Sequence, residues 1–297
     1  MLNLVPLLLA NGIVFGAIYG INAVGFSILY NSTNIINFTQ GEFVMLGGML
    51  TYALYEQAHL PLWLAALGAI AATTAIGLLV ERLAIRPLWR RQAKDWTYVF
   101  MLFAVATVLP NLVMLLISRD AHTLPAFGGA ATLKLGSVTF TSQAVWVLAL
   151  TLVIAVALHG FYNHTLLGKA MKASAVNARA AAWMGIPVER MVALSFALAA
   201  LLGALGGIVF TPLTSTQFNA GVSFTLKGFG AAIIGGLGNI TGAIVGGLML
   251  GILEALSTAF ISSLYGDAVT YAILFVILLV RPTGFFRPLV ELREQEI

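Results

Sequence analysis

Long apolar stretches separated by short polar segments make up most of the chain. A helix that crosses a lipid bilayer needs about 20 mainly apolar residues. Candidate spans of this kind are 5–29, 34–57, 61–80, 97–117, 144–162, 191–211, 242–262 and 267–281. One further apolar stretch, 220–237, is short and glycine-rich, so it is either a short span or a re-entrant segment. The pattern predicts an all-α polytopic membrane protein with about 8–10 transmembrane helices.

The composition supports this class. Apolar residues make up 60% of the 297 positions and charged residues only 9%, with a mean hydropathy of +0.98. A soluble protein has roughly 45–50% apolar and about 25% charged residues, so this chain has too few charges to cover a soluble surface. We therefore expect residues 1–297 to form a single transmembrane domain. The lack of cysteine excludes disulfides and thiol chemistry, and the scattered histidines give no metal site.

Basic residues gather in three polar segments, which orient the spans. Cytoplasmic loops of membrane proteins carry an excess of Lys and Arg. The rule predicts that 81–96, 163–190 and 281–297 are cytoplasmic, and that 118–143 and 212–219 are external. An odd number of crossings must then follow residue 219, so either 220–237 crosses or one assigned span does not. The side of the N-terminus depends on whether 34–57 crosses fully.

Glycines recur at intervals of four residues. The repeats are Gly12/Gly16/Gly20, Gly203/Gly207, Gly242/Gly246 and Gly247/Gly251. This spacing lets helix backbones approach closely, so we expect tight helix packing. The segment 235–242, which contains Gly238 and Asn239, predicts a chain break. Such a break either lines the translocation path, where irregular backbone is tolerated, or is a tight turn between two spans.

The stretch "NIINFTQGEF" (34–43) places a carboxylate in an otherwise uncharged region, because the first 41 residues carry no charged side chain. A carboxylate at membrane depth costs at least ~2.5 kcal/mol. Glu42 therefore lies either at a broken helix with Asn34, Asn37, Thr39 and Gln40, near the permeation path, or in a hydrogen bond or ion pair that fixes span 34–57 to a neighbour. If span 34–57 crosses fully, Glu42 lies a couple of turns into it. Direct binding of a cargo ammonium is the less favoured form of the first hypothesis. For Glu254, in "GILEALS", we expect a structural inter-helix or inter-subunit bond.

The cytoplasmic segment 166–190 is rich in helix-forming residues. The pattern predicts one or two short helices, with Ser174 as a possible cap of the second. Gly185 ends them, and Pro187 opens the next span at its first position. Small alanine side chains suit insertion into a protein groove, which favours docking to a cytoplasmic partner over an amphipathic helix on the lipid surface.

Five stretches in order along the chain carry a resemblance. They are "NIINFTQGEFVMLGG", "VERLAIRPLWR", "GKAMKASAVNARAAAWMGIPVERM", "GGLGNITGAIVGGLMLGILEALS" and "LLVRPTGFF". Together they resemble the LivH-type permease of branched-chain (hydrophobic) amino-acid ABC importers, over essentially the whole chain except 118–143. The family often has histidine where this chain has Gln40, which removes a titratable group and bears on the choice of cargo.

The resemblance implies a multi-subunit importer in the bacterial inner membrane, multi-pass, with a cytoplasmic C-terminus. The implied partners are a homologous second permease, two ATPase subunits and a periplasmic substrate-binding protein, with no nucleic acid. The chain has no phosphate-binding loop of the form G-x-x-x-x-G-K-[ST]. We therefore expect no enzyme activity and no bound cofactor here, with ATP and Mg on the ATPase subunits. The segment 166–190 then resembles a coupling helix, with matches at Gly168, Ala170, Ala173, Asn177, Gly185 and Ile186. Lys169 and Arg179 of the same segment are also expected to take part in coupling to the ATPase.

Residues expected along the substrate pathway are Asn34, Asn37, Thr39, Gln40, Glu42, Gly238 and Asn239. Alternatives remain open at this stage. The cargo of the same importer class could be urea, a short amide or an aromatic acid, and a stand-alone secondary transporter also uses broken helices. No constellation of catalytic side chains within the spans supports an intramembrane enzyme, and no repeated filter residues support a channel.

Overall fold

The computed structural model describes residues 5–129, 132–135, 138–261, 265–281 and 284–286. Twelve α-helices lie in this part of the chain: α1 (Val5–Thr33), α2 (Gln40–Tyr52), α3 (Leu62–Val80), α4 (Arg86–Arg90), α5 (Asp95–Leu116), α6 (Ser142–His164), α7 (Leu166–Val176), α8 (Ala178–Trp183), α9 (Val188–Phe210), α10 (Ala220–Gly235), α11 (Ile240–Phe260) and α12 (Gly266–Val280). A π-helical turn, Ala53–Gln57, continues α2, and another, Glu81–Ile85, joins α3 to α4. Strands β1 (Thr132–Leu135) and β2 (Val138–Thr141) form an antiparallel hairpin in which Thr132 pairs with Thr141.

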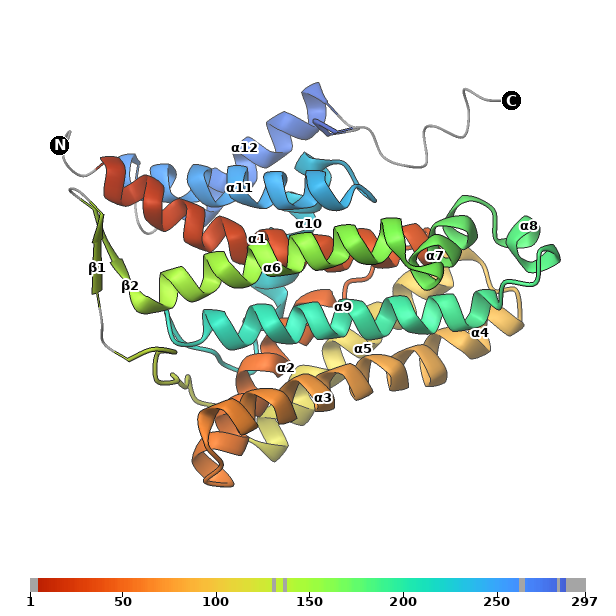
Figure 1. Cartoon of the computed structure of the whole chain (residues 1–297), viewed down its shortest axis with the longest axis horizontal. Coiled ribbons are helices and arrows are strands. Elements are labelled where there is room, and N and C mark those ends of the chain that lie inside the picture. The colour runs from red at the N-terminus through yellow and green to blue at the C-terminus, as the bar shows by residue number, and fades with distance from the viewer. Residues whose placement is uncertain (1–4, 130–131, 136–137, 262–264, 282–283, 287–297) are drawn as a thin grey trace.

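The helices form one elongated bundle with two distinct ends (Figure 1). We call the end with α4, α7 and α8 the basic end, because it carries two of the predicted cytoplasmic segments. The opposite end, with β1 and β2, is the hairpin end. Helix α1 begins at the hairpin end, and α9 begins at the basic end. Arg287 and Arg293 of the predicted cytoplasmic tail lie outside the described residues.

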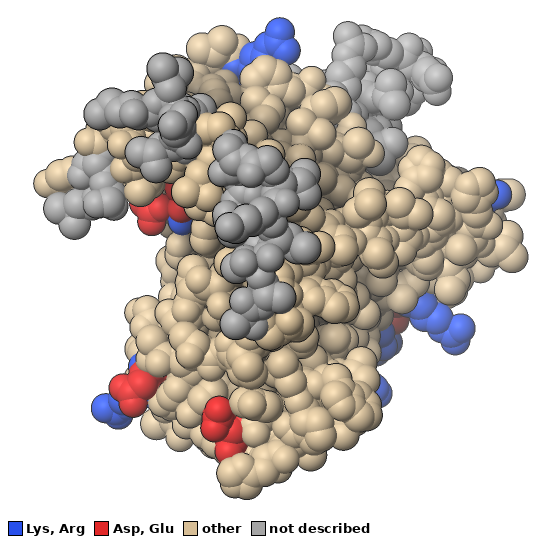
Figure 2. Space-filling view, turned by 60° about the vertical axis from the view of Figure 1, so that its left-hand side comes forward, with Lys and Arg blue, Asp and Glu red and all other residues tan. Residues whose placement is uncertain are grey.

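Six helices of the described chain are long and apolar enough to cross a membrane. They are Pro6–Thr33, Leu62–Arg90, Trp96–Leu116, Ser142–His164, Val188–Phe210 and Ile240–Phe260. Helices α10 and α12 are apolar but shorter. The outer helices expose large apolar side chains such as Leu115 and Leu116, and the face in Figure 2 shows few charges. The prediction of an all-α polytopic membrane protein is confirmed.

Glycines let the central helix α1 pack directly on α11. A Cβ atom on Gly16 would lie 2.7 Å from the Cα of Leu248, and one on Gly247 would lie 2.2 Å from the backbone nitrogen of Gly20. Any larger residue would push the two backbones apart. The predicted role of the four-residue glycine repeats in close helix packing is confirmed for this pair of helices.

The candidate span 34–57 is not one continuous helix, which corrects its predicted limits and agrees with the hypothesis of a broken helix near Glu42. Residues 34–39 are non-helical and α2 begins only at Gln40. Asn34 adopts a left-handed backbone conformation (φ 56°) that ends α1, and the side chain of Asn37 accepts a hydrogen bond from the Thr39 N–H (3.0 Å) in a local turn. Such side-chain-to-backbone bonds compete with helix formation. Glu42 therefore lies in the first turn of α2 and not a couple of turns into a helix.

Helix α10, like α2, is a short helix preceded by a non-helical segment inside the bundle. The non-helical segment 211–219 follows α9 and forms a backbone bridge between Thr216 and His122 at the hairpin end. Helix α10 then begins beside the start of α2, where the Gly41 N–H donates to Thr225 Oγ1 and Thr225 Oγ1 donates to the Phe38 carbonyl, both at 3.2 Å. After α10 the chain lies beside the C-terminal end of α1, where Asn31 Nδ2 donates to the Gly238 carbonyl (2.7 Å). Residues 211–235 thus run between the two ends of the bundle, as expected for the alternative in which 220–237 crosses.

Candidate functional site

The polar side chains before α2 fasten its non-helical entry to the surrounding helices. Thr39 Oγ1 donates to the Leu102 carbonyl of α5 (3.0 Å), and Gln40 Nε2 donates to the Ala199 carbonyl of α9 (3.1 Å). Asn37, Thr39 and Gln40 are all buried. Since buried polar groups need hydrogen-bond partners, these residues hold an irregular stretch of backbone inside the bundle.

Glu42 lies where two helix N-termini meet. Its side chain is in the first turn of α2, is 1% exposed, and packs against Gly221 in the first turn of α10. A Cβ atom on Gly221 would lie 2.1 Å from Glu42 Oε2. Helix N-termini carry a partial positive charge, which stabilises a nearby carboxylate. Within the described residues, Glu42 Oε2 has no hydrogen-bond partner, and the adjacent N-termini of α2 and α10 favour a negative charge at this position.

Gly238 and Asn239 lie apart from Glu42, in the turn that joins α10 to α11. Gly236 and Gly238 both have positive φ (90° and 88°), and the Asn239 side chain accepts from the Gly242 N–H (2.8 Å) as the N-cap of α11. Of the two hypotheses for 235–242, the geometry is that of a tight turn. The structure therefore does not bring together all of the residues predicted for the substrate pathway.

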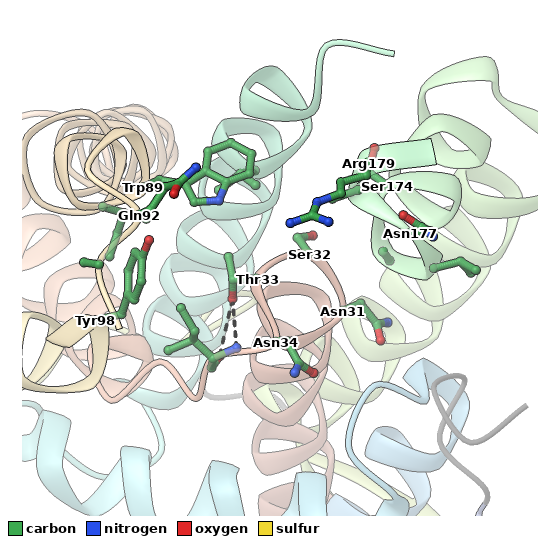
Figure 3. A pocket seen from close by; sticks show the side chains of 17 residues that line it. Asn31, Ser32, Thr33, Asn34, Trp89, Gln92, Tyr98, Ser174, Asn177 and Arg179 are labelled. Atoms are coloured by element: carbon green, nitrogen blue, oxygen red, sulfur yellow. Dashed lines mark hydrogen bonds between the residues drawn. The ribbon is translucent and has the colours of Figure 1, made fainter. Parts of the chain in front are cut away.

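A cavity of about 890 Å³ opens at the basic end between the end of α1, the segment from α4 to α5, and the α7–α8 connection. Figure 3 shows the side chains that line it, including Asn31, Asn34, Trp89, Tyr98, Ser174, Asn177 and Arg179. Asn34 was predicted for the pathway, whereas Asn177 and Arg179 were predicted for coupling. One cavity is thus lined both by a residue predicted for the substrate pathway and by residues predicted for coupling. Their positions in the sequence do not indicate that they lie close together.

The segment 166–190 folds into the two short helices that its composition predicts. Thr165 caps α7 by accepting from the Gly168 N–H (3.0 Å), and Gly168 packs so closely on α6 that a Cβ atom would lie 2.1 Å from the Phe161 carbonyl oxygen. Gly185 has φ 85° and ends α8, and the Ile186 N–H returns to the Ala181 carbonyl (3.0 Å). Lys169 and Ala173 are exposed on α7.

Two local expectations for this segment are wrong. Ser174 is buried within α7, and the cap of α8 is Asn177, whose side chain accepts from the Ala180 N–H (3.0 Å). The short connection leaves Asn177 with extended backbone, the conformation that a capping residue needs. Pro187 stands at the N-cap of α9 and not at its first helical position.

Sequence reasoning missed an exposed apolar pair at the end of α8. Trp183 is 87% exposed and Met184 is 84% exposed, and we call this pair the α8 tip. In Figure 1, α8 projects beyond the bundle at the basic end. The pair could have been noticed in the sequence, because Trp183 and Met184 are two large apolar residues at the end of a segment rich in alanine and charged residues.

An ion cluster also links four helices. Lys227 Nζ of α10 lies 2.7 Å from Glu254 Oε1 of α11 and 3.0 Å from Asp267 Oδ1 of α12, and it donates to the Tyr19 hydroxyl of α1 (3.3 Å). The structure places Glu254 in an inter-helix ion pair within the chain. Lys227 was missed as its partner, although a lysine inside the apolar stretch 220–237 was the signal.

Comparisons with known proteins give the family. Residues 8–278 match the model of the family described as "Branched-chain amino acid transport system / permease component". The high-affinity branched-chain amino acid transport system permease protein LivH of Escherichia coli (strain K12) is 33% identical, over 95% of each chain. BraD of Pseudomonas aeruginosa, a permease protein of the same description, is 31% identical over 95% of this chain and 96% of its own.

A solved structure shares the fold. PsaBC from Streptococcus pneumoniae in complex with Fab aligns with a TM-score of 0.51 at 12% identity, covering 97% of this chain and 94% of that one. At this identity the likeness concerns the fold alone. The family match over nearly the whole length carries the assignment: this chain belongs to the family of permease components of branched-chain amino acid transport systems.

Proposed function

We propose that this chain is the transmembrane permease subunit of an ABC importer that carries branched-chain or hydrophobic amino acids across the bacterial inner membrane. The observation that carries the proposal is the family match over residues 8–278, together with the LivH and BraD relatives that are similar over 95% of the chain. These relatives are named for branched-chain amino acids, so urea, short amides and aromatic acids are not the favoured cargo.

The partners follow from this role. Two ATPase subunits bind ATP and Mg and power transport, a homologous second permease completes the path, and a periplasmic binding protein delivers the cargo. The α8 tip supports an ATPase interface at the basic end, because exposed aromatic and methionine side chains are enriched in protein interfaces. Helix α12 ends beside α10, where the Phe285 N–H donates to the Ile234 carbonyl (2.8 Å), which supports a cytoplasmic C-terminus.

The mechanism that we propose is alternating access. A partner shifts a conformational equilibrium only through contacts that differ between the two states. Closure of the ATPase dimer would move α7 and α8, and these helices line the 890 Å³ cavity together with the end of α1. Movement of α8 therefore changes the shape of a cavity that also contains Asn34, which connects the coupling segment with the beginning of the broken span.

Vesicle uptake tests the proposal. The chain is reconstituted with its copurifying ATPase, permease and binding protein, and ATP-dependent uptake of labelled leucine, isoleucine and valine is measured beside urea and phenylalanine. We expect uptake of the branched-chain amino acids that requires ATP and every subunit. Leucine transport by the chain alone would instead establish a secondary transporter, and exclusive uptake of urea would overturn the cargo.

A further inference from the structure

Four arginines line one surface pocket at the basic end, where α3 continues into α4. The pocket has a volume of about 430 Å³, and its lining consists of Arg82, Arg86, Pro87, Arg90 and Arg91. The π-helical turn Glu81–Ile85 lies inside this stretch. Turns of this kind interrupt regular helices frequently at functional sites, and Arg82 belongs to the turn while the other three arginines follow it.

The acidic side chains nearby balance only part of this charge. Arg86 makes a two-pronged pair with Glu81, with nitrogen–oxygen distances of 3.1 and 3.3 Å. Arg90 lies 3.4 Å from Glu189, and both side chains are largely exposed. Arg82 and Arg91 are exposed, and among the residues whose side chains the structure describes, which do not include Asp95, no carboxylate lies within ion-pair distance of either. The pocket therefore has more positive charge than its own acids neutralise.

An apolar strip adjoins the pocket. Leu78 and Leu79 are 41% and 52% exposed and lie one helical turn before Arg82, on the same face of the helix. Leu83, next to Arg82, is 70% exposed. In a chain that spans a membrane, exposed leucines of an apolar helix face the acyl chains. The unbalanced arginines thus stand at the end of a lipid-facing strip, at the level where headgroups lie.

We propose that this arginine pocket binds the phosphate of an anionic phospholipid, whose acyl chains lie along Leu78, Leu79 and Leu83. Guanidinium groups bind phosphate oxygens in a two-pronged manner, and basic pockets on the cytoplasmic side of membrane proteins accept anionic headgroups. The leucine strip favours a lipid over a free phosphate ion, because inorganic phosphate has no apolar part to bury. This inference does not depend on the cargo.

Native mass spectrometry of the purified full-length chain, with the subunits that copurify with it, tests the lipid site. The protein is titrated with phosphatidylglycerol, with phosphatidylcholine and with inorganic phosphate. The test variant is Arg82→Gln/Arg91→Gln. The control variant, Lys94→Gln/Arg190→Gln, removes the same charge from exposed positions at the same end that do not line the pocket.

We expect tighter retention of phosphatidylglycerol than of phosphatidylcholine by the wild-type chain. The test variant should lose affinity for phosphatidylglycerol roughly 30-fold, about fivefold for each arginine, and the control should lose little. If the double variant does not fold, Arg91→Gln alone should give the fivefold loss. Equal losses in test and control variants, no preference between the lipids, or displacement of the lipid by inorganic phosphate would each overturn the proposal.

Discussion

Lys227 and Glu254 form an ion pair at 2.7 Å between α10 and α11, in a region that is otherwise almost free of charge. The lysine side chain is 10% exposed and the glutamate 20%. Asp267, which lies 3.0 Å from the same nitrogen, is 58% exposed and therefore well hydrated. The three side chains join α10, α11 and α12. Because their exposed fractions differ, we expect their contributions to the stability of the chain to differ as well.

Removal of the lysine should destabilise the chain most. Lys227→Met leaves Glu254 largely buried without its cation, which costs about 3 kcal/mol of unfolding free energy. Asp267→Asn, as a matched control on the exposed partner, should cost less than about 1 kcal/mol. Thermal unfolding in detergent measures both. The double variant Lys227→Met/Glu254→Gln should recover part of the loss, because it removes both charges, and a purely additive result would argue against the pair.

Glu42→Gln should lower stability modestly and leave the affinity for cargo unchanged. The substitution keeps the shape of the side chain but removes the charge that the N-termini of α2 and α10 stabilise, an interaction of about 1 kcal/mol. Thermal unfolding and the KM of leucine uptake are measured together, with Glu56→Gln at an exposed position as control. A raised KM at wild-type stability would instead place the carboxylate on the path of the cargo.

Gly16→Ala should destabilise the contact between α1 and α11. The added methyl group would lie 2.7 Å from the Leu248 Cα, and such overpacking costs about 1–3 kcal/mol. Gly160→Ala on α6 is the matched control, because no heavy atom outside its own helix turn lies within 4 Å of the new methyl group. There, alanine should raise stability by about 0.5–1 kcal/mol through its helix propensity. Similar melting temperatures for the two variants would contradict the close packing.

Trp183→Ala should weaken association with the ATPase subunits about 30-fold without loss of stability. An exposed tryptophan makes few contacts within its own chain, but as the anchor of an interface it contributes about 2 kcal/mol to binding. Copurification of the ATPase subunits and their affinity in nanodiscs measure the effect. Trp146→Ala, which changes a 54% exposed tryptophan on α6, is the control. If both variants bind the ATPase subunits equally well, the α8 tip is not the anchor.

Much of the fold follows from the sequence, because length and apolar content define a membrane span directly. The spans at α3, α5, α6 and α9 lie within a few residues of their predicted limits. The limits predicted for span 34–57 were wrong because average hydropathy does not register local turns. The two asparagines, Asn34 and Asn37, turn the backbone before α2 begins, and their residue type was the only sign of it.

The candidate site was harder to predict, since several of its hydrogen bonds join residues 159 to 187 positions apart. Glu42 was recognised as unusual, but its neighbour Gly221 has no side chain and gave no signal. Lys227 was visible in the sequence, yet its pairing with Glu254 and Asp267 depends on how α10, α11 and α12 turn toward one another. The cap of α8 was misplaced by three residues because Ser174 and Asn177 are both good capping residues, and only tertiary packing decides between them.

The paired half-helices have a mechanical consequence. Helices α2 and α10 start side by side inside the protein and run toward opposite ends of the bundle, each preceded by irregular chain. A continuous helix transmits a push along its whole length, whereas a half-helix with a non-helical lead can tilt independently about its inner tip. Each end of the bundle therefore has one half-helix that can tilt, α10 at the basic end and α2 at the hairpin end. The two half-helices tilt about one shared pivot, the contact of Gly41, Glu42 and Gly221. A force applied at the basic end can therefore reach α2 by way of α10 and this pivot, in addition to any push along the continuous helices.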